Sequence, residues 1–136
     1  MKKKVKKIKS RIFVQKANPY RYEILVSVGA TGKQVARFLA KGSHRKYVEE
    51  NLEYFDEIIE GKFLGRAIHV KQIKFMALVL PRFKNEWDYY ESLIHELNHI
   101  VYFISDDRAF KDEMEARAYL QEFLFHEIRR KIQLSK

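Results

Sequence analysis

Three segments of the chain have the hydrophobic pattern of β-strands. Arg11 to Gln15 and Arg21 to Val28 are rich in β-branched and aromatic residues, and an Asn-Pro turn signal separates them. Ile68 to Leu80 shows a strand pattern again and ends in FMALVL, in which both alternating faces are apolar. We therefore expect the first two segments to pair, and the third to form one strand that is covered on both faces.

Helical spacing of apolar residues predicts two helices between these strands. Thr31 and Gln34 have the spacing of a capping box, and the apolar face that follows stops at Gly42. The next helix is expected to begin after Ser43 and to end at Gly61, because apolar residues recur at helical spacing between them. These residues are Val48, Leu52, Phe55 and Ile59.

The last third of the chain is expected to form a hairpin of two long helices. Asn85 and the acidic residues after it favour a helix start, and a loop at residues 106–108 separates this helix from another, from about Lys111 towards Ile132. Together the elements predict an α+β fold in which a small mixed sheet packs against helices. One stripe of the first long helix is predicted to be buried, and it consists of Trp87, Tyr90, Ile94, Leu97, Val101 and Ile104.

Length and composition predict one folded domain, residues 11–136, preceded by a basic and flexible tail at residues 1–10. The 136 residues suffice for one core, and 46% of them are hydrophobic. The formal net charge is +9, but seven of the 27 basic residues lie in positions 1–11 and four in 129–136, so the body between is nearly neutral. The tail is expected to be a solvated terminus, and a weak contact with nucleic acid is its alternative role.

Other features of the sequence favour a cytoplasmic protein with no membrane partner. No apolar stretch of signal-peptide length follows the basic start, and the longest apolar run, Phe75 to Leu80, is far shorter than the roughly 20 residues of a membrane-spanning helix. The sequence has no cysteine, which excludes disulfides and thiolate metal sites. Any metal ion must therefore be bound by histidine, carboxylate or water.

The motif HELNH at residues 95–99 lies within the first long helix. At about 100° per residue, His95 and His99 are about 40° apart, on the side opposite the predicted buried stripe. Two imidazoles one turn apart can reach a single metal ion, and Glu96 between them is offset enough to hold a metal-bound water and act as general base. The alternative is an ordinary polar helix surface that carries two solvated histidines.

A catalytic zinc site needs a third protein ligand, and the helix hairpin suggests where it lies. If the turn centres near residue 107, residues whose numbers sum to about 214 lie at the same height. His99 then faces Glu115, and His95 faces Tyr119. Glu115 is thus the first candidate ligand. Those that follow are Glu113 and then His126, which like Glu122 lies lower on the hairpin and needs a different turn.

The sequence IHELNHIVYFI followed by EARAYLQEFLF resembles the gluzincin metallopeptidases, in which two motif histidines and a glutamate of a later helix hold zinc. It resembles in particular the small single-domain peptidases encoded by phages and prophages, over about Phe75 to Phe125. In that family the third ligand begins a Glu-Ala pair, which corresponds here to Glu115 and Ala116. The resemblance implies a zincin-like fold, a Zn2+ ion and hydrolysis of peptide bonds in a protein or peptide substrate.

The enzyme hypothesis gives each residue of the site a role. His95, His99 and Glu115 leave one zinc position open for water, and Glu96 takes the proton of the water and hands it to the leaving amine. An extended substrate peptide is expected to pair with the edge of strand 68–80.

Such enzymes usually use a further donor to stabilise the oxyanion. Tyr119 is the first candidate, and its alternative role is that of an aromatic packed between the helices. His44 and His69 are expected to be surface or strand residues rather than metal ligands. The other candidate donors are Tyr102, His126 and His69.

Two other functions are compatible with the sequence. One is a structural or regulatory protein that binds a metal without catalysis, although such a site has no use for Glu96. The other is a DNA-associated protein that uses its basic ends, as in the SprT-like group, which takes a third histidine after the motif in a pattern not found here. A peptidase acting as a toxin or cleaving a regulator is a variant of the main hypothesis.

Overall fold

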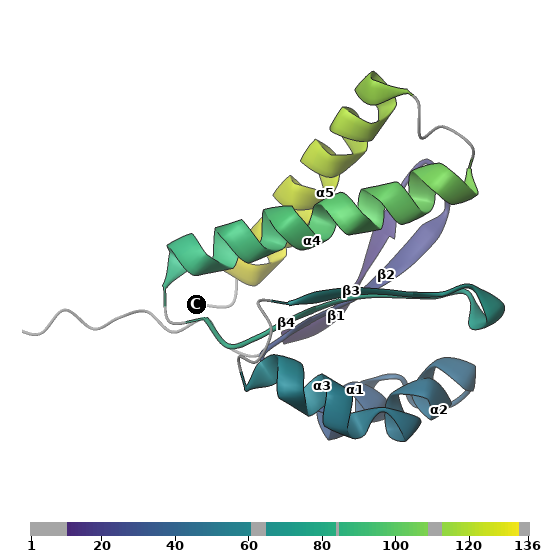
Figure 1. Ribbon diagram of the computed structural model, residues 1–136, viewed down its shortest axis with the longest axis vertical. Coiled ribbons are helices and arrows are strands. Elements are labelled where there is room, and N and C mark those ends of the chain that lie inside the picture. Colours follow the sequence, from purple (N-terminus) through teal and green to yellow (C-terminus); the bar gives the residue numbers. More distant parts are fainter. Residues whose placement is uncertain (1–10, 61–64, 84, 109–112, 134–136) are drawn as a thin grey trace, which may run out of the picture.

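A mixed β-sheet lies between two layers of helices in the computed structural model, which describes residues 11–60, 65–83, 85–108 and 113–133 (Figure 1). Over these residues the sheet has four strands, in the order β1-β2-β4-β3. The predicted α+β class is confirmed, whereas the predicted tail at residues 1–10 lies outside the described residues. The strands are β1 (Arg11–Ala17), β2 (Tyr22–Val28), β3 (Arg66–Val70) and β4 (Phe75–Leu80).

The pairing of the strands places β4 at the centre of the sheet. β1 and β2 form the predicted antiparallel pair, β2 runs parallel to β4, and β3 is antiparallel to β4. Every residue of β4 is buried, and its side chains alternate between two cores, with Leu78 in one and Ala77 in the other. The prediction that FMALVL is covered on both faces is confirmed.

The predicted single strand from Ile68 to Leu80 was wrong, because a reversal divides it. A 3-10 helix, η1 (Lys71–Ile73), follows β3, and Lys74 takes a left-handed conformation with φ of 50°, which turns the chain back into β4. The sequence carried a sign of this turn that the prediction did not use, because the alternation of apolar residues changes phase between Val70 and Ile73. As a result, β3 is an edge strand within the described residues, whereas β4 has a neighbour on each side.

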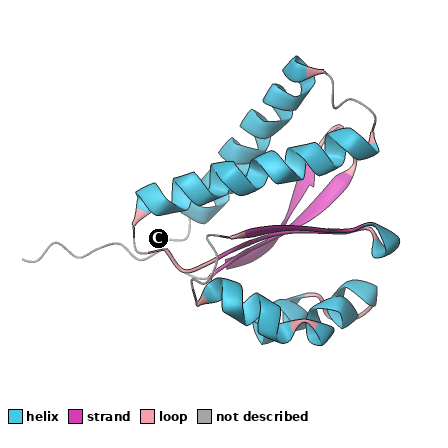
Figure 2. Cartoon of the chain, in the orientation of Figure 1, coloured by secondary structure: helices cyan, strands magenta, loops and turns pink. Residues whose placement is uncertain are grey.

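Short helices cover the sheet face that bears Ala77 (Figure 2). The predicted capping box is present, since Thr31 Oγ1 accepts a hydrogen bond from the Gln34 amide and the Gln34 side chain accepts one from the Thr31 amide. The predicted helix from Ser43 is interrupted at Asn51, whose φ of −128° and ψ of 29° are not helical. Its predicted end, Gly61, lies outside the described residues. The helices are α1 (Gly32–Phe38), α2 (Ser43–Glu50) and α3 (Leu52–Ile59).

Two long helices, α4 (Glu86–Asp107) and α5 (Met114–Gln133), cover the other face of the sheet (Figure 1). α4 begins as predicted, with Asn85 Oδ1 accepting a hydrogen bond from the Asp88 amide at 2.9 Å. It is longer than predicted, because residues 106 and 107 form its last turn instead of a loop. No helix within the described residues is both long and apolar enough to cross a bilayer.

The buried face of α4 differs from the predicted stripe. Trp87 and Ile94 are 72% and 49% exposed, whereas Leu93 and Ile100 are fully buried. At 100° per residue, the buried face is rotated by roughly 60° from the prediction. The cause is that α4 packs against both α5 and the sheet. The predicted stripe is turned towards α5, where Ile94 and Leu97 line a cavity with Ala118. The sheet covers the neighbouring face of α4. This rotation decides which motif residues are buried.

Candidate metal and catalytic site

α4 presents the two motif histidines side by side on its exposed surface. His95 and His99 are both exposed, and their ring centroids are 5.1 Å apart with an interplanar angle of 74°. The separation of four residues produces this contact, because residues i and i+4 are neighbours on a helix. The predicted shared face outside the core is therefore confirmed.

Glu96 is turned inwards, unlike the histidines. It is 4% exposed, and its Oε1 lies 3.9 Å from Nε2 of His95. The rotation of α4 explains this burial, because Glu96 falls at the margin of the face that the sheet covers. Gly65, immediately before β3, allows the close approach: a Cβ atom there would stand 3.2 Å from Glu96 Cγ.

A cleft of about 350 Å³ separates this part of α4 from the start of β3. Because it contains Glu96, the candidate general base, we call it the catalytic cleft. Its carboxylates outnumber its one arginine, and it opens beside the edge strand. The side chains and backbone that line it include Gly65, Arg66, Asp88, Glu91, His95 and Glu96.

The predicted third ligand, Glu115, is not brought to the histidines. Within the described residues, no group of three or more His, Cys, Asp or Glu side chains is placed to hold a metal ion. Glu115 is exposed in the first turn of α5, and Glu113, just before that helix, is exposed as well. The ligand set therefore stays a prediction.

The orientation of α4 gives the physical reason. Residues of α4 and α5 lie opposite each other along the hairpin as predicted, because Ile94 and Leu97 line a cavity with Ala118 and Gln121. However, the histidines lie at least about 100° around α4 from these two residues. In Figure 1 the beginning of α5 also diverges from α4, while its later turns pack beneath it. Equal height on the hairpin did not imply a shared face.

The other candidate residues on α5 are exposed. Tyr119 is 68% exposed, which argues against its alternative role as an aromatic packed between the helices. His126 and Glu122 pair with each other, with Nε2 and Oε1 4.0 Å apart and side chains 62% and 67% exposed.

His44 and His69 lie in the short helix α2 and in β3. His44 Nε2 is 2.8 Å from the carbonyl oxygen of Ile73, so this ring links α2 to the turn before β4. The His69 ring packs against Phe103 of α4, with centroids 5.2 Å apart. Burial, with a smaller effect of the nearby Lys71, lowers the pKa of His69 below its ordinary value. Both histidines thus have packing roles within the fold.

Sequence reasoning missed most of the lining of the catalytic cleft, including Gly65 and Glu91. Gly65 was not singled out, because a glycine before a strand is first of all a turn signal. Glu91 lines the cleft one helical turn before His95. Its signal was present, since Glu91, His95 and His99 follow each other at intervals of four residues and so share one helix face.

Comparisons with protein-family models, with curated proteins and with solved structures each found no match for this chain.

Proposed function

We propose that this protein is a zinc-dependent peptidase in which His95 and His99 bind the metal and Glu96 is the general base. One observation carries the proposal: the two imidazoles are adjacent on α4, while the glutamate between them is turned into a cleft beside an edge strand. His95 and His99 thus form the proposed metal-binding pair, and the carboxylate of Glu96 is turned inwards.

The separation of the two imidazole rings is compatible with binding of a single zinc ion. Two imidazoles bound to one ion at a tetrahedral angle have ring centroids about 5 Å apart, given zinc–nitrogen distances of about 2.0–2.1 Å. The observed centroid distance is 5.1 Å. We keep Glu115 as the proposed third ligand because of the resemblance to gluzincins, and we add Glu91 as an alternative because it lines the catalytic cleft beside His95.

The position of Glu96 suits proton transfer. A bound zinc ion supplies Lewis acidity, which makes water acidic near neutral pH and polarises a carbonyl group. Glu96 then accepts a proton from the attacking water at its carboxylate and returns it to the leaving amine nitrogen. Its burial against Gly65 restricts the side chain to few orientations, as general-base catalysis requires. A purely structural metal site needs no such base.

An extended peptide is the substrate that this arrangement favours. Within the described residues β3 is at the sheet edge, and its first residue, Arg66, lines the catalytic cleft. A peptide that adds to this edge as a further strand passes His95 and Glu96. We therefore assign substrate pairing to β3 in place of the whole segment 68–80. Tyr119 stays our candidate oxyanion donor because its phenol is exposed.

Metal content tests the proposal first. Elemental analysis of untagged protein supplied with zinc should find about one zinc ion per chain, and His95→Ala and His99→Ala should each abolish it. His126→Ala should keep the zinc, because this histidine is equally exposed but pairs with Glu122 on α5. Loss of zinc in His126→Ala would make His126 the third ligand. Wild-type protein without metal under these conditions would overturn the proposal.

The third ligand is tested by parallel variants. Glu115→Ala should lose zinc, whereas Glu122→Ala should keep it. Retention of zinc in Glu115→Ala, with loss in Glu91→Ala, would move the third ligand to the catalytic cleft; loss in Glu113→Ala would move it to the residues just before α5.

Catalysis needs its own measurement. A screen with unstructured protein substrates should show zinc-dependent cleavage in the wild type. Glu96→Gln should reduce the rate by at least about a hundredfold while retaining zinc, because general-base catalysis contributes about 10²–10⁴-fold. Zinc bound by both proteins with cleavage by neither would identify a metal-binding protein without peptidase activity.

A further inference from the structure

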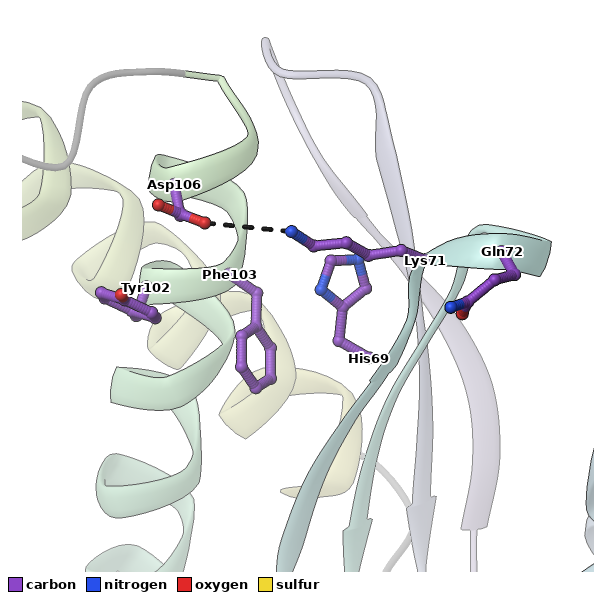
Figure 3. A pocket seen from close by; sticks show the side chains of 6 residues that line it. All are labelled: His69, Lys71, Gln72, Tyr102, Phe103 and Asp106. Carbon is purple, nitrogen blue, oxygen red and sulfur yellow. Dashed lines mark ion pairs between the residues drawn. The ribbon is translucent and has the colours of Figure 1, made fainter.

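Another cavity lies between β3 and α4, further along both elements (Figure 3). It has a volume of about 410 Å³, and we call it the aromatic pocket. The catalytic cleft is lined by the start of β3 and the first half of α4, whereas this pocket is lined by the end of β3 and the last turns of α4. The lining residues are His69, Lys71, Gln72, Tyr102, Phe103 and Asp106.

Rings from the two elements form the walls of the aromatic pocket. Figure 3 shows the rings of His69 on β3 and Phe103 on α4 beside each other between the two elements, and their centroids are 5.2 Å apart at an interplanar angle of 36°. Tyr102, which is 47% exposed, adds a third ring. Aromatic walls of this kind favour an aromatic occupant, because offset or tilted ring pairs are attractive beyond their burial.

The charges of the pocket are balanced. Lys71 Nζ and Asp106 Oδ2 are 4.0 Å apart and connect η1, which follows β3, to the last turn of α4 across the pocket (Figure 3). Burial lowers the pKa of His69 and so favours the neutral form of this ring. A charged side chain that entered the pocket would lose its hydration. It would gain no free partner there, because Lys71 and Asp106 already pair with each other, so a neutral side chain is favoured.

We propose that the aromatic pocket selects a neutral aromatic side chain of the substrate peptide, about three residues from the bond that is cleaved beside Glu96. The spacing follows from β3, because Arg66 lines the catalytic cleft and His69 lines the pocket, and strands advance about 3.3 Å per residue. A substrate peptide paired with β3 has the same rise per residue, so three of its residues also span the distance from the catalytic cleft to the aromatic pocket. The selection rests on the proposed function only in taking the catalytic cleft as the place of cleavage.

Binding of defined peptides tests the selection without catalysis. The probe is a blocked eight-residue peptide of alanine and serine that carries one phenylalanine, moved through every position. The full chain with Glu96→Gln is titrated and backbone amide shifts are followed by NMR. In the best register, phenylalanine should improve the affinity about tenfold over alanine. The shifts should be largest at residues 65–72 and 99–106.

Variants locate the preference. Phe103→Leu keeps an apolar side chain but removes the ring, and it should abolish the preference for phenylalanine. Phe123→Leu, at a 39% exposed position on α5, is the matched control and should retain it. Gln72→Trp fills the pocket from an exposed position and should also abolish the preference, which guards against misfolding of Phe103→Leu.

The outcomes separate this proposal from the proposed function. Equal affinity for phenylalanine and alanine peptides would overturn the aromatic selection even if zinc and peptidase activity are found. A preference that survives both Phe103→Leu and Gln72→Trp would overturn its location. A preference that only these variants abolish would establish the pocket, whatever the zinc and cleavage measurements show.

Discussion

Gly65 lies directly against Glu96. A Cβ atom at Gly65 would stand 3.2 Å from Glu96 Cγ and 2.9 Å from Leu80 Cδ2, and the backbone of Gly65 has φ of +145°, a conformation that other residues rarely adopt. The residue before the edge strand therefore limits where the buried carboxylate can sit. It couples the geometry of the sheet to the candidate general base.

Gly65→Ala should damage both stability and activity. The added methyl group brings backbone strain and pushes against Leu80 and Glu96, so we expect the free energy of unfolding to fall by about 2–3 kcal/mol. Displacement of Glu96 should also slow peptide cleavage at unchanged zinc content. Urea denaturation and a cleavage assay on zinc-loaded protein measure the two effects.

Gly42→Ala is the control for Gly65→Ala. Gly42 also has a positive φ, +103°, but an added Cβ there would have no atom within 4 Å. It should lose stability of about 1–2 kcal/mol through strain alone and keep its cleavage rate. Equal losses of activity in the two variants would show that the contact between Gly65 and Glu96 has no catalytic importance.

The sequence predicted most elements of the fold because local signals determine them. The capping box at Thr31, the strand pair and the central apolar strand all depend on patterns within a few residues, and all three are present. The reversal at Lys74 was missed because the apolar residues on both sides of it were read as one strand, although their alternation changes phase between Val70 and Ile73. Its left-handed backbone follows from tertiary packing, which a pattern of side chains does not encode.

The candidate site was predicted in part for the same reason. The pairing of His95 with His99 needs only helix geometry, and it is observed. The burial of Glu96 depends on how α4 is rotated against the sheet and α5, and an amphipathic helix with two packing partners has an ambiguous stripe. Placement of Glu115 depends on the angle between two helices, which residue numbers do not contain.

Asn85→Ala should destabilise the helix that carries the motif. Asn85 caps α4 through its bond to the Asp88 amide at 2.9 Å, and loss of such a cap costs about 0.5–2 kcal/mol. Asn98→Ala, at an exposed position in the middle of α4, should be neutral or slightly stabilising because alanine favours helices. Thermal denaturation of both variants checks the cap; equal melting temperatures would contradict it.

Neighbouring tyrosines of α4 should respond oppositely to loss of their hydroxyl groups. The Tyr89 hydroxyl is buried and has no hydrogen-bond partner among the described residues, and burial raises its pKa above the ordinary value. Tyr89→Phe should therefore be neutral or stabilise the protein by about 1 kcal/mol. Tyr90→Phe should destabilise it by a similar amount, because the Tyr90 hydroxyl accepts a bond from Arg129 Nε at 3.3 Å. Urea denaturation that ranks the two variants in the reverse order would refute this.

Protonation of His69 should oppose folding as the pH falls. Burial lowers the pKa of His69 below 6.5, so between pH 6.5 and that lower pKa the unfolded chain binds more protons at this residue than the folded chain does. The contribution of His69 to stability is therefore complete above pH 6.5 and declines as the pH falls towards the folded-state pKa.

His69→Phe isolates this effect. Phenylalanine keeps a ring against Phe103 but does not titrate. The difference in free energy of unfolding between variant and wild type, measured in urea from pH 7.5 down to pH 5, should shift in favour of the variant below pH 6.5. An NMR titration of the His69 ring gives an independent check, and a midpoint at or above 6.5 would show that the ring is not desolvated. Because His69 lines the aromatic pocket, its protonation should also weaken binding of the phenylalanine peptide over the same pH range.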